Sequence, residues 1–328
     1  MRRGGRTIFR AAALLTVMAL LFTACAGDEE LNVPQAPKKK IAMVVKMMHG
    51  DYWNTVRMGA ETAAREFNAE LLFAAPEEET DIDGQIRIVR QFVEEDVDAL
   101  VLAASDYMAL GRVTDQAGNA GIPVISIDSE VASTKVRSYI GANNYVAGRQ
   151  AGMELVEHTG DNSRVAIVSF VEGARNASQR EEGLLDLLAQ YSGVTVVDMR
   201  YSESDLTTAE QVTRDILKKH GTIDGIVALN AIATSGVTNV IRQMGLEGKV
   251  KVVGFDSTSD IMEMLQEGVI QSTIVQNAFT MGYLGVKHAI EATEGMKLPE
   301  RVDSGTVIID TENMFFEENQ KLLFPFVK

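Results

Sequence analysis

The stretch that decides the fold is residues 41–74, which read IAMVVKMMHGDYWNTVRMGAETAAREFNAELLFA. Its apolar run at 41–47 predicts a strand, the helical spacing of apolar residues at 53–68 predicts a helix, and the run at 70–74 predicts a second strand. This order is typical of a βαβ unit in a parallel sheet. The polar and aromatic residues after the first strand then lie at the carboxyl end of a strand, where ligands bind in such sheets.

The same alternation continues along the chain. Further strands are expected at 99–103, 123–128, 138–142, 164–170, 194–200, 224–230, 250–256, 272–276 and 305–310. Helices are expected at 83–95, 108–119, 145–158, 177–190, 208–220, 233–244, 259–267 and 281–294. Thr207 and Glu210 have the spacing of a capping box, which supports the start of one helix. Two strand sets with a similar layout predict an α/β protein of two doubly wound parallel-sheet lobes.

Composition and charge exclude several classes of protein. The 328 residues include 31 Lys and Arg against 46 Asp and Glu, whereas a surface that binds nucleic acid is basic. The single cysteine cannot form an internal disulfide or a Cys-x-x-Cys zinc site. No phosphate loop or dinucleotide-binding glycine motif is present, so no cofactor is indicated. Residues 79–90 partly match a calcium loop, but Arg90 stands where a bidentate glutamate is required, so a helix start is the better interpretation.

The amino-terminal segment differs from everything after it. Four arginines precede an apolar run at 11–22 and the small residues before Cys25, an arrangement typical of an export signal. The run is shorter than the roughly 20 apolar residues that span a bilayer. Residues 21–25, LFTAC, are similar to a bacterial lipobox, which predicts a lipoprotein signal peptide over 1–24 and a lipid on Cys25; a plain secretory signal is the alternative. Residues 25–37 have the composition of a solvated tether.

Several short motifs recur in a fixed order across the rest of the chain. They are DYWNTVRMGA at 51–60, IPVISID at 122–128, YIGANNYVAG at 139–148, Asn176 with Arg180 and Gly183, ALN at 228–230, VVGFD at 252–256, and Gln276 followed by Gly282. With these motifs, residues 38–311 resemble the periplasmic sugar-binding proteins of the ribose/galactose type. These are type I periplasmic binding proteins that serve as the substrate-binding components of ABC importers.

The resemblance implies a three-strand hinge between the lobes, with crossings near Ala142, Gln276 and Ser304. The implied amino-terminal lobe comprises residues 38–142 and 277–304, and the carboxy-terminal lobe comprises residues 143–276 and 305–328.

The resemblance also implies a function. It implies a monomer outside the cytoplasm, lipid-anchored to the bacterial cell membrane, that captures a sugar or polyol by hinge closure and delivers it to an ABC permease. It implies no enzyme, no metal and no nucleic-acid partner. A sugar-sensing receptor that signals to a membrane histidine kinase remains an alternative.

The resemblance assigns the ligand cleft mainly to residues at the ends of strands. They are Tyr52, Trp53, Asp128, Arg180, Asn230, Asp256 and Gln276. The sequence itself adds Lys46 as a candidate, because a cation is unusual at the end of an apolar strand. Carboxylates and amides pair well with hydroxyls, arginine donates in a fixed fork, and a flat aromatic ring covers the apolar face of a sugar.

Each of these residues also has a structural alternative. The aspartates are common turn residues and helix caps, the aromatic pair could be a hydrophobic staple, and Lys46 could extend to the surface. Arg180 could form a surface ion pair on its helix, and Asn230 and Gln276 could satisfy the backbone at strand ends.

Three positions depart from the ribose pattern. Gly50, Ser129 and Ser204 stand where the ribose binder carries an asparagine, an arginine and a phenylalanine. Smaller side chains predict a wider or differently polar cleft, which favours a pyranose, a polyol or another modified sugar over ribose.

Two rival classes of protein are considered. Asp128 and Asp256 could be the acid and base of a glycoside-processing enzyme. Cationic or amide partners are expected to keep both carboxylates ionised, which would leave no proton donor. A transcription regulator of the same ligand fold would need a helix-turn-helix before the first strand, where this chain has an export signal.

Overall fold

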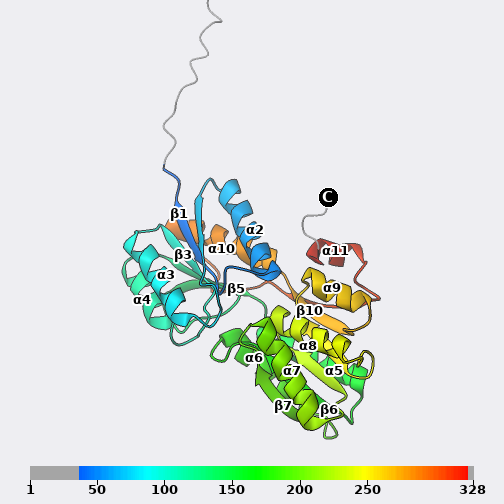
Figure 1. Ribbon diagram of the computed structural model, residues 1–328. Coiled ribbons are helices and arrows are strands. Elements are labelled where there is room, and N and C mark those ends of the chain that lie inside the picture. The colour runs from blue at the N-terminus through cyan, green and yellow to red at the C-terminus, as the bar shows by residue number, and fades with distance from the viewer. Residues whose placement is uncertain (1–36, 324–328) are drawn as a thin grey trace, which may run out of the picture. The chain divides into compact units, whose positions relative to one another are not determined.

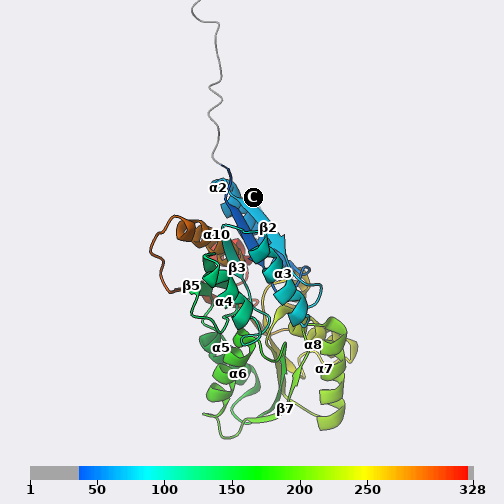
Figure 2. The ribbon, with the colours of Figure 1, turned by 90° about the vertical axis from the view of Figure 1, so that its left-hand side faces the viewer.

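The computed structural model describes residues 37–323, which form two α/β lobes (Figure 1). The predicted signal peptide, Cys25 and the predicted tether up to residue 36 lie outside the described residues. Within the described range, no helix has the length and apolar character needed to cross a membrane. Each lobe has a six-stranded sheet with helices on both faces (Figures 1 and 2), which confirms the predicted doubly wound architecture.

The amino-terminal lobe is built on a sheet with the strand order β11-β5-β4-β3-β1-β2, in which all pairs are parallel. Its strands are β1 (Lys40–Val44), β2 (Glu70–Ala74), β3 (Ala99–Leu102), β4 (Val124–Ile127), β5 (Val136–Gly141) and β11 (Arg301–Asp303). Its helices are α2 (Asp51–Glu66), α3 (Ile82–Glu94), α4 (Gly111–Asn119) and α10 (Ala278–Thr293).

The carboxy-terminal lobe has the strand order β12-β10-β9-β8-β6-β7, with β12 antiparallel to β10. Its strands are β6 (Arg164–Ser169), β7 (Thr195–Tyr201), β8 (Gly225–Ala228), β9 (Lys251–Phe255), β10 (Ser272–Gln276) and β12 (Thr306–Ile309). Its helices are α5 (Asn144–Thr159), α6 (Arg175–Leu188), α7 (Leu206–His220), α8 (Ala231–Gln243), α9 (Ser259–Gln266) and α11 (Glu317–Leu323).

Each sheet carries an apolar core on both faces because successive side chains of a strand point to opposite sides. In β1, Ile41 and Met43 pack into the core on the α2 and α10 side, whereas Ala42 and Val44 pack into the core on the α3 and α4 side. The strand is therefore apolar at every buried position instead of alternating, as expected for a parallel sheet covered on both faces.

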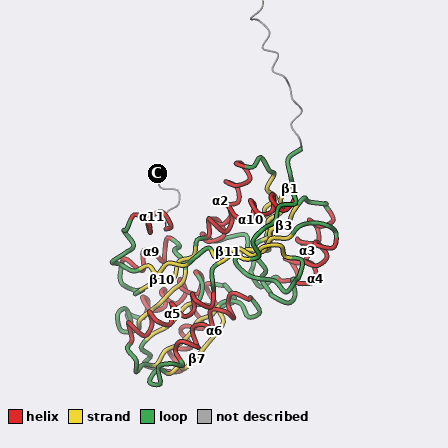
Figure 3. The backbone as a smooth tube through the Cα atoms, turned by 180° about the vertical axis from the view of Figure 1, so that it is seen from behind, coloured by secondary structure: helices red, strands yellow, loops and turns green. Residues whose placement is uncertain are grey.

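The chain crosses between the lobes at three places: between β5 and α5, between β10 and α10, and between β11 and β12 (Figure 3). Helix α10, orange in Figure 1, therefore packs beside α2 in the amino-terminal lobe although it follows β10 of the other lobe. The crossings place the carboxyl ends of strands from both sheets on the sides of one cleft.

Two pairs of glycines allow the helices that carry site residues to pack closely. A Cβ atom on Gly59 of α2 or on Gly282 of α10 would collide with a backbone carbonyl oxygen of the other helix. In the other lobe, Gly148 of α5 and Gly183 of α6 have the same relation. Larger residues at these positions would push the paired helices apart, and with them the side chains at their amino-terminal ends.

Three details of the secondary structure differ from the sequence analysis. The predicted capping box was wrong: α7 begins after Asp205, which has an extended backbone and a carboxylate that accepts from the Thr208 amide at 2.7 Å. A carboxylate is favoured at this helix end, so Asp205 takes the role assigned to Thr207. Strand β11 was not predicted because it is short and mostly exposed, and α11 was not predicted either.

Candidate ligand-binding site

A cavity of about 290 Å³ lies between the two lobes. Pockets for drug-sized ligands occupy roughly 300–1,000 Å³, so this cavity suits a small molecule. Residues from both lobes line it, and all eight predicted site residues are among them: Lys46, Tyr52, Trp53, Asp128, Arg180, Asn230, Asp256 and Gln276.

Asp128 and Tyr52 form a hydrogen-bonded pair on the amino-terminal side of the cavity. Asp128 follows β4 with φ at +59°, a backbone conformation that aspartate tolerates. Its Oδ1 accepts from the Tyr52 hydroxyl at 2.7 Å, and its Oδ2 accepts from Nδ2 of Asn176, in the other lobe, at 3.1 Å. Burial, reinforced by the charges of Asp128 and Asp256, raises the pKa of Tyr52 well above its usual value. The hydroxyl therefore stays protonated and donates.

Lys46 is buried, with only 1% of its surface exposed, and does not extend to the surface as one interpretation allowed. Its Nζ lies 3.0 Å from Oε1 of Glu79, 3.0 Å from Oδ1 of Asn176 and 3.6 Å from Oδ2 of Asp128. The ring of Phe170 lies below it, 5.6 Å from Nζ to the ring centroid. The ammonium group is thus held by acceptors from both lobes at the cavity wall.

Arg180 is equally buried, which excludes the surface ion pair considered for it. Its Nε donates to Oδ1 of Asn144 at 2.9 Å, and its Nη1 donates to the Leu229 carbonyl at 2.7 Å. The guanidinium lies between the rings of Phe170 and Phe255, 5.5 and 4.5 Å from their centroids. Its buried Nη2 has no hydrogen-bond partner among residues 37–323. The guanidinium group is therefore held in place by two hydrogen bonds, while its Nη2 remains available to donate to a ligand.

Asp256 and Gln276 form a second polar pair on the carboxy-terminal side. Oδ1 of Asp256 accepts from Nε2 of Gln276 at 2.9 Å, and Oδ2 accepts from the Ala231 amide at 3.1 Å. Burial raises the pKa of Asp256, although the charge of Arg180 opposes this shift. For the pKa of this carboxyl, the loss of water on burial outweighs the opposing effects of Arg180 and Gln276. Oε1 of Gln276 is buried and unpartnered within the described part of the chain.

Asn230 and Trp53 combine lining and structural roles. Oδ1 of Asn230 caps α8 by accepting from the Ala233 amide at 2.8 Å, while its Nδ2 donates to the Ser204 hydroxyl at 3.0 Å. Trp53 is 6% exposed and packs in the core of its lobe. Its ring meets that of Tyr52 edge-on, with centroids 5.1 Å apart. Trp53 is therefore mainly a core residue whose remaining surface reaches the cavity.

Several lining residues were missed by the sequence analysis, the most polar of which are Glu79, Asn176 and Asp260. Phe170 was missed as well, although it directly follows β6, and Asn176 belongs to a recognised motif. Phe170 and Asn176 could therefore have been identified from the sequence. Glu79 could not have been identified in this way, because it lies in the loop between β2 and α3, well past the end of the strand.

Of the three positions that depart from the ribose pattern, Gly50 lines the cavity, and a Cβ placed on it would meet open space. Ser129 and Ser204 are buried outside the cavity wall. The extra room expected in the cleft therefore depends on Gly50. Ser204 can influence the cavity only through its contacts with neighbouring residues.

A metal site is not formed where the sequence partly matched a calcium loop. Asp81 caps α3 by accepting from the Gly84 amide at 2.8 Å, so this run is a helix start. Over residues 37–323, no group of three or more His, Cys, Asp or Glu side chains is arranged to hold a metal ion.

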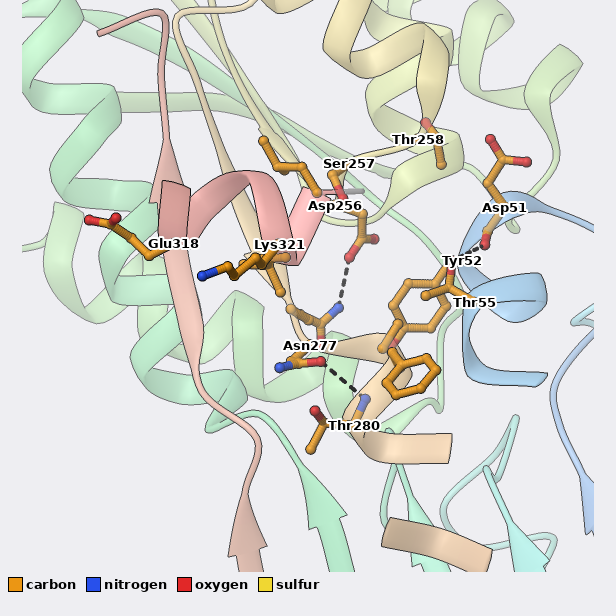
Figure 4. A pocket seen from close by; sticks show the side chains of 15 residues that line it. Asp51, Tyr52, Thr55, Asp256, Ser257, Thr258, Asn277, Thr280, Glu318 and Lys321 are labelled. Atoms are coloured by element: carbon orange, nitrogen blue, oxygen red, sulfur yellow. Dashed lines mark hydrogen bonds between the residues drawn. The ribbon is translucent and has the colours of Figure 1, made fainter. Parts of the chain in front are cut away.

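A second hollow, also of about 290 Å³, adjoins the cavity at the β10–α10 crossing (Figure 4). Asp51 and Thr55 of α2 lie on one side of it, and Glu318 and Lys321 of α11 lie on the other. It shares Asp51, Tyr52, Asp256, Thr258 and Gln276 with the cavity. These shared residues therefore form the boundary between the two hollows.

The lobes also touch outside the cavity. Glu130 of the amino-terminal lobe accepts from Nε2 of Gln179 at 3.2 Å and lies 3.7 Å from Nε of Arg175, and both partners belong to α6. The Tyr107 amide donates to the Gly173 carbonyl at 3.0 Å. None of these described residues lines the cavity, so part of the interlobe contact is independent of the site.

Comparison with known proteins identifies the class. Residues 41–297 match the periplasmic binding protein domain family, and the chain belongs to that family. The D-ribose/D-allose-binding protein of Pseudomonas aeruginosa is 29% identical over 309 residues, which cover 91% of this chain and 96% of that protein. The predicted ribose/galactose-type family is thereby confirmed.

Solved structures agree with the predicted fold. A carbohydrate transporter solute binding protein from Agrobacterium radiobacter, in complex with D-arabinose, has a TM-score of 0.85 and 31% identity and covers 87% of this chain and 99% of that one. An ABC transporter solute binding protein from Agrobacterium vitis with bound D-fucose has a TM-score of 0.85 and 30% identity, with coverage of 87% and 100%. These relatives are binding proteins.

Proposed function

We propose that this chain is the extracytoplasmic solute-binding component of an ABC importer, which captures a sugar or related polyol between its lobes and delivers it to a membrane permease. The single observation that carries the proposal is a pair of buried, unpartnered groups in residues that line one cavity, Nη2 of Arg180 and Oε1 of Gln276. Unpartnered buried polar groups are rare in folded proteins, so these two point to a ligand.

A sugar fits both groups because each of its hydroxyls can donate and accept a hydrogen bond. Arg180 would donate to it and Gln276 would accept from it, while the carboxylates of Asp128 and Asp256 offer further acceptor positions. The cavity volume suits a single sugar ring. The names of the relatives, which bind ribose, allose, arabinose and fucose, point the same way.

The two lobes contribute different parts of the set. Asp128, Lys46 and Tyr52 come from the amino-terminal lobe, and Arg180 and Asp256 come from the other lobe. A ligand that contacts residues of both lobes binds the closed arrangement better than an open one, so its binding energy favours closure. The closed shape would then be what a permease recognises. In this role the chain changes no bond in the sugar, and it is not an enzyme.

The preferred ligand in this proposal is a pyranose, a polyol or another modified sugar instead of ribose, because Gly50 leaves space beside the cavity. Location is part of the same proposal: the chain acts as a monomer outside the cytoplasm, held to the membrane by a lipid on Cys25. Mass spectrometry of the membrane-bound protein should find a lipidated amino-terminal Cys25, and Cys25→Ser should release the protein from the membrane.

Thermal unfolding and calorimetry with D-ribose, D-allose, D-arabinose, D-fucose, D-galactose and xylitol test the function. A ligand at 100 times its Kd stabilises the folded state by about 2.7 kcal/mol, which raises Tm by several degrees. Arg180→Lys keeps the charge but loses the fork, and it should weaken binding at least tenfold. Arg112→Lys, at an exposed position of α4, is the matched control. If no sugar or polyol raises the Tm of the unaltered protein, the proposed function is wrong.

A further inference from the structure

The loop between β2 and α3 contains three successive glutamates with different surroundings. Glu77 and Glu78 are exposed, whereas Glu79 is only 5% exposed. A buried carboxylate is costly unless charged or hydrogen-bonding partners surround it. The partners of Glu79 therefore indicate why the chain keeps an acid at this position.

The Glu79 carboxylate contacts both lobes, one with each oxygen. Oε1 lies 3.0 Å from Nζ of Lys46, in its own lobe. Oε2 accepts from the hydroxyl of Ser204, in the other lobe, at 2.7 Å. The same Ser204 oxygen accepts from Nδ2 of Asn230 at 3.0 Å.

This arrangement connects two cavity-lining side chains through one acid. Lys46 is held directly by Glu79, and Asn230 is held through Ser204. Ser204 has φ at +52°, so the chain adopts an unfavourable backbone conformation at the residue that meets Glu79. Since Glu79 and Ser204 belong to different lobes, their hydrogen bond can exist only when the lobes are together.

We propose that Glu79 is a positioning residue that couples closure of the lobes to the orientation of Lys46 and Asn230 in the cleft. The proposal rests on the proposed function, since it assigns a task to a residue of the same site. Closure completes the Lys46–Glu79–Ser204–Asn230 chain of contacts without any ligand atom. Glu79 therefore raises the closed fraction of the ligand-free protein, and ligand affinity increases in proportion to that fraction.

The test measures closure in the absence of sugar. Cys25 is the only cysteine of the chain, so Cys25→Ser with Glu94→Cys and Lys218→Cys leaves one spin-label site on each lobe, both at exposed positions. Pulsed electron paramagnetic resonance on this chain then gives the ratio of closed to open molecules. Glu79→Ala should lower this ratio at least tenfold, as expected for a charge-assisted hydrogen bond. Glu78→Ala, from the same loop, should leave it unchanged.

A double-mutant cycle separates coupling from a general structural effect. Ser204→Ala should lower the closed ratio on its own but add little to Glu79→Ala, because both changes remove the same bond. Glu79→Gln should restore part of the ratio, since its amide oxygen can still accept from Ser204. Circular dichroism should show each variant folded. For any sugar that binds, Kd should rise by the factor by which the closed fraction falls.

Two results would overturn the inference: an unchanged closed ratio in Glu79→Ala, or fully additive effects of Glu79→Ala and Ser204→Ala. Failure of the proposed function gives a different pattern, in which no sugar binds the unaltered protein. The sugar-free distance measurement tests Glu79 in either case.

Discussion

Replacing Asp256 with asparagine should change stability and ligand affinity in opposite directions. The substitution removes the charge but keeps the shape, and asparagine tolerates the left-handed backbone, φ +70°, that Asp256 adopts. The new side-chain oxygen can still accept from the Ala231 amide. The Gln276 amide can turn so that its oxygen accepts from the new NH₂ group, which replaces the bond now made to Asp256.

The stability effect follows from the direction of the pKa shift. Burial raises the pKa of Asp256 in the folded protein, so the folded state binds a proton more readily than the unfolded chain does. Above the raised pKa the ionised carboxylate opposes folding, and this penalty disappears as the pH falls below the unfolded value. Asp256→Asn should therefore raise the stability of the ligand-free protein at pH 7 by about 1 kcal/mol, roughly 2 °C in Tm.

The affinity effect has the opposite sign. A charge-assisted hydrogen bond to a sugar hydroxyl contributes about 1.5–3 kcal/mol, so its loss should weaken binding about 10- to 150-fold. Thermal unfolding at pH 7 and pH 4 and calorimetry at pH 7 measure both quantities, and the difference in Tm should shrink at the lower pH. Asp161→Asn, at an exposed position outside the cavity lining, is the control. A lower Tm at pH 7 together with an unchanged Kd would refute the reasoning.

Three further predictions concern residues outside the cavity. Glu130→Gln removes an interlobe ion pair, so calorimetry should show every sugar binding about two- to fivefold more weakly; a changed order of preference would contradict this. Burial alone would raise the pKa of Asp198, but hydrogen bonds from three basic side chains hold this pKa well below its usual range. The ionised carboxylate therefore stabilises the fold above about pH 4, and this stabilisation is lost as the pH falls further. Urea unfolding of Asp198→Asn should therefore show a loss of about 1 kcal/mol at pH 6 that fades toward pH 2, and a loss that is constant with pH would count against it. In urea unfolding, Gly282→Ala should lower the stability of the protein by about 1–3 kcal/mol, because the new Cβ meets a backbone carbonyl of α2. Gly285→Ala should lower the stability less, because its Cβ meets only side chains.

Much of the fold could be predicted because local sequence determines it. Strands β2 and β10 match their predicted bounds to the residue. Strand β11 could not be found in this way: Arg301–Asp303 contains a single apolar residue and exists because it pairs with β5. Thr207 shows a similar limit, because two acceptable caps lie close together and only the backbone path selects Asp205.

The candidate site was predictable to the extent that it follows the ends of strands. Asp128 and Asp256 could be located because they directly follow buried strands. Glu79 could not, since its burial depends on a loop meeting Ser204 of the other lobe. The aromatic pair shows the same limit: sequence places Tyr52 and Trp53 near the cleft, but helix rotation decides which ring enters the core. Whether these residues bind a sugar remains a prediction.

The position of α10 has a consequence for the order in which the protein can form. This helix completes the core of the first lobe against α2, yet it is synthesised only after every strand of the second lobe except β12. A nascent chain therefore carries an unfinished first half for most of its synthesis, with the apolar surface of α2 uncovered. The amino-terminal lobe can complete its core only after this late helix has been made.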